Sequence, residues 1–161
     1  FLGRGHENFS DDILNLFDWM NRYRRNFFPR DFETTSMRRW DNYFWWLELS
    51  EFPEKGIVNP VDWPRRGARA VKTEANIGAN NSIHITTGAG HVSVWLTPDL
   101  VDFNLPLRLQ VNGGRLNGNA FIQPDLTVML EDVRTRGDRQ HPFWAKVDSV
   151  AGRRVANAKQ P

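Results

Sequence analysis

Hydrophobic residues recur at helical spacing near the start of the chain. Ser10 is a good N-cap, and two aspartates follow it in the first turn, where the helix dipole favours negative charge. Pro29 is expected to close the element, and the pattern predicts a single helix over residues 10–25. Its apolar face needs a partner surface and consists of Ile13, Leu16, Phe17 and Met20.

From about residue 40 the apolar residues alternate with polar ones, as is typical of strands. The run YFWWLEL, residues 43–49, is the first of these segments. Leu126, Val128 and Leu130 predict another strand, with a short helix as the alternative. Asn-Gly steps at Asn112 and Asn117 predict turns. The remaining alternating segments are 71–77, 83–85, 92–96, 105–111 and 143–147.

These short strands, separated by turns, predict a mainly β fold. The spacing favours an antiparallel β-sandwich of immunoglobulin-like type. We expect the sandwich over residues 67–149, preceded by a Trp-rich strand and linker over 31–66. The sequence AGRRVANAKQP has little to bury, so we expect a flexible tail over 150–161.

Composition and charge restrict the chemistry of the chain. It has 161 residues and no cysteine, which excludes a disulfide, a thiolate zinc site and a thiol nucleophile in these residues. The net charge is only +2, and acidic residues are interleaved with the basic clusters, so we do not expect nucleic-acid binding. No apolar run approaches the ~20 residues of a membrane span.

The histidines give no metal-site spacing. His84 lies on the polar side of a predicted strand, His91 follows a hairpin turn, and His141 precedes a proline in a loop. We therefore expect no metal and no cofactor. The tripeptide Arg136-Gly137-Asp138 is interpreted as a charged turn before a strand.

His6 has a different setting. It lies in GRGHENF, a glycine-rich loop between an apolar pair and the predicted helix. A loop held by rigid elements suits a general base, although a lone histidine there is more often a loop or capping residue.

The segment GRGHENFSDDILNLFDWM resembles the C-terminal histidine loop and final helix of an α/β-hydrolase of the serine-esterase or prolyl-oligopeptidase-like kind. The residues from SIHITTGAG to PFWAKVD are similar to a β domain that follows such hydrolase domains in bacteria. The resemblance covers most of the chain. It implies that residues 1–30 end a hydrolase domain and that His6 is the triad histidine, acting as general base and acid.

The resemblance also implies a missing partner. No G-x-S-x-G occurs in the sequence, and the family order places the nucleophile and the triad acid upstream of His6. We therefore expect the C-terminal part of a serine hydrolase, esterase or peptidase, inactive without its N-terminal hydrolase part and able to self-associate. The compartment is not fixed by the sequence, and an exported location is favoured. Ester, peptide and acetylated-sugar substrates all stay open.

A second hypothesis is a non-enzymatic β-sandwich that serves as an interaction or carbohydrate-binding module. Its basis is RRWDNYFWW, residues 38–46, whose aromatic side chains suit either packing between domains or a platform for ligands. Packing is the favoured interpretation, because such a segment left open promotes aggregation.

Overall fold

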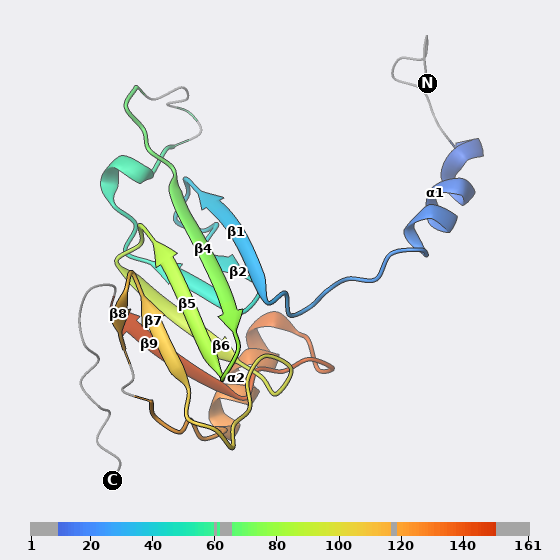
Figure 1. Ribbon diagram of the computed structural model, residues 1–161. Coiled ribbons are helices and arrows are strands. Elements are labelled where there is room, and N and C mark those ends of the chain that lie inside the picture. Colours follow the sequence, from blue (N-terminus) through green and yellow to red (C-terminus); the bar gives the residue numbers. More distant parts are fainter. Residues whose placement is uncertain (1–9, 60, 62–65, 117–118, 151–161) are drawn as a thin grey trace.

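A computed structural model describes residues 10–59, 61, 66–116 and 119–150. Most of this part of the chain forms two β-sheets that pack face to face, and a helix near the N-terminus stands away from them (Figure 1). The mainly β prediction is therefore confirmed. No helix within the described residues is long and apolar enough to cross a membrane.

Sheet A has five strands within the described residues, in the spatial order β1-β4-β5-β7-β8. The strands are β1 (Asp31–Ser36), β4 (Val71–Gly78), β5 (Ser82–Thr87), β7 (Arg108–Val111) and β8 (Gly114–Arg115). Sheet B has four in the same part of the chain, in the order β2-β3-β6-β9. They are β2 (Tyr43–Phe44), β3 (Leu47–Ser50), β6 (His91–Leu96) and β9 (Ala145–Val150).

One hydrophobic core fills the space between the sheets. The alternation predicted over 105–111 is confirmed in part, because Leu107, Leu109 and Val111 are buried whereas Leu105 is exposed and precedes β7. Strand β6 is buried on both sides, so its polar-side residues Ser93 and Trp95 are covered as well. The core draws on both sheets, with Val71, Ala75, Ile77, Ile83 and Ile85 from sheet A and Leu47, Leu49, Val92, Val94 and Leu96 from sheet B.

The sandwich is not wholly antiparallel, which corrects the prediction. Strands β5 and β7 pair in parallel, with Ser82 opposite Arg108 and Ile85 opposite Val111. The chain leaves sheet A after β5, runs through β6 in sheet B, and returns as β7. Two crossings between the sheets bring it back in its original direction.

The sheets also begin earlier than residue 67. Strand β1 was not predicted, yet it pairs along its full length with β4, from Asp31 opposite Asn76 to Ser36 opposite Val71. The run 43–49 was predicted as one strand but forms the hairpin β2–β3 around Trp45 and Trp46. Residues 31–50 therefore supply strands to both sheets.

The N-terminal helix is shorter than predicted. A 3-10 turn, η1 (Ser10–Asp12), leads into α1 (Ile13–Met20), and the N-cap is Asp12 rather than Ser10, with no side-chain cap hydrogen bond. After Met20 the amides of Arg22 and Tyr23 bond to carbonyls three residues back, which tightens and ends the helix. The helical segment thus begins at Ser10, as predicted, but ends at Met20, five residues earlier than the predicted residue 25.

The alternating set at 126–130 belongs to a helix, α2 (Leu126–Arg136). Asp125 caps its first turn by accepting a hydrogen bond from the Thr127 amide, at 2.7 Å. Gly137 ends it in the left-handed conformation, with φ 71°. The N-cap at Asp125 and the glycine at 137 favour a helix, and they decide the structure over the short alternating pattern of residues 126–130. A second short turn in the described chain is η2 (Glu54–Gly56).

Candidate functional site

His6 lies outside the described residues, so its role as a triad base stays a prediction. The helix that follows it is described, and α1 buries none of its side chains. The four residues of its predicted apolar face keep between 47 and 52% of their surface exposed. Figure 1 shows α1 separated from both sheets by an extended segment. The described part of the chain therefore leaves this apolar face uncovered.

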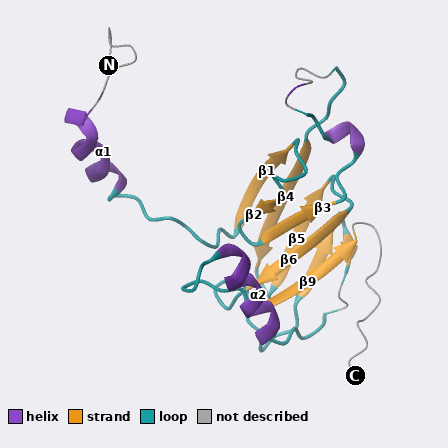
Figure 2. Ribbon diagram, turned by 180° about the vertical axis from the view of Figure 1, so that it is seen from behind, coloured by secondary structure: helices purple, strands orange, loops and turns teal. Residues whose placement is uncertain are grey.

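A second feature lies where that extended segment reaches the sheets. We call it the junction hollow. It is an open concavity of about 810 Å³, lined by residues 25–29, by residues 43–45 of the β2–β3 hairpin, and by Arg136, Asp138 and His141. Three segments that are far apart in sequence therefore meet here, and Figure 2 shows α2 beside the nearby end of sheet B.

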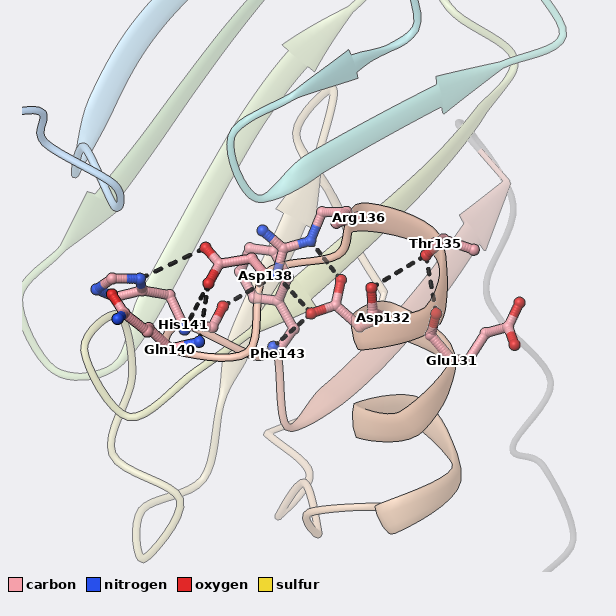
Figure 3. Close-up of polar contacts among 8 residues, drawn as sticks. All are labelled: Glu131, Asp132, Thr135, Arg136, Asp138, Gln140, His141 and Phe143. Atoms are coloured by element: carbon pink, nitrogen blue, oxygen red, sulfur yellow. Dashed lines mark hydrogen bonds and ion pairs between the residues drawn. The ribbon is translucent and has the colours of Figure 1, made fainter.

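A buried carboxylate organises one wall of the hollow. Asp132 on α2 is only 1% exposed, and both its oxygens accept hydrogen bonds from the Arg136 guanidinium. The Phe143 amide also donates to Asp132, at 2.9 Å, and Arg136 donates to the His141 carbonyl, at 2.9 Å (Figure 3). The hydrogen bond from Arg136 to Asp132 raises the pKa of Arg136. This network fixes the end of α2 against the chain that enters β9.

Asp138 and His141 form the adjacent turn. The Asp138 carboxylate accepts from the amides of Gln140 and His141, at 2.9 and 3.1 Å, and lies 3.4 Å from His141 Nδ1 (Figure 3). Slight burial opposes the charged form of Asp138, but the two amides and the nearby cations outweigh it, so its pKa is lowered. Both charged residues of the Arg-Gly-Asp tripeptide are therefore engaged within the chain, as expected for a structural turn.

The Trp-rich segment divides between packing and exposure. Trp46 is fully buried, and its Nε1 donates to the Pro29 carbonyl at 2.8 Å, which ties the incoming segment to the hairpin. Trp45 and Trp40 remain 40% and 68% exposed. Packing is thus the role of Trp46; Trp45 packs one side of its ring on Phe32, with centroids 4.7 Å apart, and leaves the rest exposed.

Aromatic contacts link residues 25–29 to the turn that contains His141. The Phe27 ring stacks on the His141 ring, with centroids 4.2 Å apart and planes 13° from parallel. Burial raises the pKa of the Tyr43 hydroxyl, which, like an ordinary tyrosine, is neutral and able to donate over the physiological range. Tyr43 and Arg136 are close enough to interact electrostatically.

No metal centre is formed in the described part of the chain. Within residues 10–59, 61, 66–116 and 119–150, no three His, Asp or Glu side chains come together to hold an ion. His84 instead contacts Gln110 on the outer face of sheet A, through Nδ1 at 3.2 Å. It is exposed, as its position on a strand predicted.

Several residues of the junction hollow are noticeable in the sequence, among them Asp138, His141 and part of the segment 38–46, but their meeting was not predicted. The Asp132–Arg136 pair has the i, i+4 spacing of a helical ion pair, and treating 126–136 as a helix would have revealed it. Nothing in the sequence points to the meeting of Tyr43, Trp45 and His141, because that meeting depends on the tertiary fold.

Comparison of the chain with protein-family models, curated proteins and solved structures finds no match.

Proposed function

We propose that this chain is the C-terminal part of a serine hydrolase, either an esterase or a peptidase. In this proposal His6 is the triad histidine, and the serine and the acid lie in an upstream hydrolase domain. His6 would take the proton of the serine hydroxyl during attack and return it to the leaving group. The resemblance of GRGHENFSDDILNLFDWM to the histidine loop and final helix of that fold supports the assignment.

The observation that carries the proposal is the uncovered apolar face of α1. The sandwich core is complete without this helix, which contributes no side chain to it. Covering the exposed half of Ile13, Leu16, Phe17 and Met20 would contribute on the order of 4 kcal/mol, from the usual value for burying such side chains. A final helix that packs on a hydrolase sheet, directly after the histidine loop, would supply this cover.

The β unit would then be an accessory domain of immunoglobulin-like type, attached through residues 21–30. A triad histidine without its nucleophile does not start acyl transfer, so the 161-residue chain is expected to be inactive alone. The partner in this proposal is the upstream hydrolase part of the same gene product.

Substitution of His6 in the complete gene product tests the proposal. His6→Ala should lower turnover of an activated ester by about 10³-fold or more, because the serine loses its base. The melting temperature should change little, because the loop histidine contributes little to a core. His84→Ala is the matched control and should keep full activity, since His84 lies on the outer face of sheet A. Full activity in His6→Ala would refute the assignment.

A further inference from the structure

The junction hollow presents aromatic rings to solvent on a rigid frame. Phe27, Tyr43 and Trp45 line it, and each keeps between 38 and 40% of its surface exposed. The frame beneath them is fixed by the Trp46–Pro29 hydrogen bond and by the buried Asp132–Arg136 pair. Phe27 carries His141 stacked on its ring and the Arg25 guanidinium 5.5 Å from its centroid, so Trp45 is the ring best placed to stack on a ring-shaped ligand.

Trp45 occupies a strained backbone position at the rim. It is the first residue of the two-residue turn between β2 and β3, and its φ is 50°, a conformation that favours glycine. The turn would be relaxed with glycine, yet a tryptophan stands there, with its ring 4.7 Å from that of Phe32. Strain of this kind is common at binding sites, and it motivates a test of Trp45 as a ligand-contacting ring.

Polar groups at the hollow are available for hydroxyl partners. The Tyr43 hydroxyl, Trp45 Nε1 and His141 Nε2 make no hydrogen bond to the described residues. All three residues line the hollow, and a neutral tyrosine hydroxyl, an indole N–H and an imidazole nitrogen can each bond a hydroxyl group. A ligand rich in hydroxyl groups would satisfy all three.

The charges of the hollow cancel. Arg25 and Arg136 are the cations of the lining and Asp138 is its anion, while Asp132 neutralises Arg136 from behind. A phosphate or an acidic chain would find no excess positive charge here. The volume of about 810 Å³ lies within the usual range for small-ligand sites, and the open form leaves room for a chain to continue on either side.

We propose that the junction hollow is a binding site for a neutral oligosaccharide, with one sugar ring stacked on Trp45. The proposal goes beyond the hydrolase assignment and does not depend on His6. The stacked ring would lie between the Trp45 and Phe27 sides of the hollow, and Tyr43, His141 and Asp138 would bond its hydroxyl groups.

Titration of the 161-residue chain with neutral hexasaccharides of glucose, xylose and N-acetylglucosamine, followed by calorimetry, tests the site. At least one of the three sugars should bind. Trp45→Ala should weaken that binding about tenfold or more, which is the loss expected for one stacked aromatic ring. Trp40→Ala is the matched control, because Trp40 is more exposed but lies outside the hollow, and it should bind as the unmodified chain does.

Phe27→Ala provides a second test, because Phe27 belongs to the segment before β1 and its loss leaves the sheets intact. It should weaken binding as well, with an unchanged circular dichroism spectrum. Absence of binding by all three sugars overturns the proposal, as does equal weakening by Trp40→Ala and Trp45→Ala. Binding of a proline-rich peptide or of inorganic phosphate at Trp45, in place of sugar, also overturns it. His6→Ala should leave sugar binding unchanged, so failure here and failure of the hydrolase proposal are separable.

Discussion

The two helices of the described chain differ in an instructive way. α1 has a regular apolar face but buries no side chain and has no side-chain N-cap. α2 has a weak pattern, with Leu126 and Leu130 exposed, yet it is capped at both ends and holds one buried carboxylate. An amphipathic pattern thus identifies a face that needs a partner, whereas specific polar contacts decide where a helix is fixed.

Removal of the buried carboxylate should have the largest effect on α2. Asp132→Ala leaves Arg136 without its ion-pair partner and the Phe143 amide without its acceptor. We expect the free energy of unfolding in urea to fall by about 1 to 3 kcal/mol, because the Phe143 amide loses its acceptor while the Arg136 side chain, 25% exposed, stays solvated. Glu131→Ala is the control, because it removes only an exposed pair with Arg134, and its unfolding midpoint should hardly move. Equal effects of the two substitutions would show that Asp132 does not anchor the helix.

The N-caps provide a smaller and more direct comparison. Asp125→Ala removes the hydrogen bond to the Thr127 amide, and we expect it to lower the free energy of unfolding by about 1 kcal/mol. Asp12→Ala should cause no measurable change in urea unfolding, because Asp12 makes no cap hydrogen bond and α1 contributes nothing to the core. If Asp12→Ala lowered the free energy of unfolding as much as Asp125→Ala, α1 would have to fold cooperatively with the sandwich.

The turn after α2 should make the free energy of unfolding depend slightly on pH in the acid range. The pKa of Asp138 is lowered below its ordinary value of 3.8, so the carboxylate stabilises the folded state above that pH. This contribution should disappear as the pH falls below 3.8 and through the lowered pKa. Asp138→Asn should therefore reduce the slope of stability against pH between about pH 4 and pH 2, measured by urea unfolding. An unchanged slope would show that Asp138 makes no such contribution.

Alternation in the sequence was sufficient to find most of sheet A. Residues 71–77 and 83–85 alternate cleanly, because one side of β4 and β5 meets the core and the other meets solvent. Strand β1 escaped prediction because its inward side chains, apart from Ser36, are only partly buried, which leaves little hydrophobic pattern. Alternation of apolar and polar residues marks a strand only where one side of the strand is fully buried, and it is lost where burial is partial.

The candidate sites were less accessible to sequence reasoning. The apolar face of α1 was predicted residue by residue, because helical spacing alone defines it. The junction hollow was not predicted, since it depends on a hairpin at Trp45 that the alternation of 43–49 concealed. Its polar wall depends on Asp132, whose burial follows from the docking of α2 and not from its own segment.

The sandwich leaves the apolar face of α1 uncovered, and we propose that this face is an interface. Sedimentation velocity of the 161-residue chain over a range of concentrations tests it most directly. We expect the unmodified chain to self-associate, so that its sedimentation coefficient rises with concentration. The double variant Leu16→Asp/Phe17→Asp should sediment as a monomer, while Asn15→Asp, an exposed position outside that face, should behave as the unmodified chain. An unmodified chain that stays monomeric at every concentration would contradict the claim.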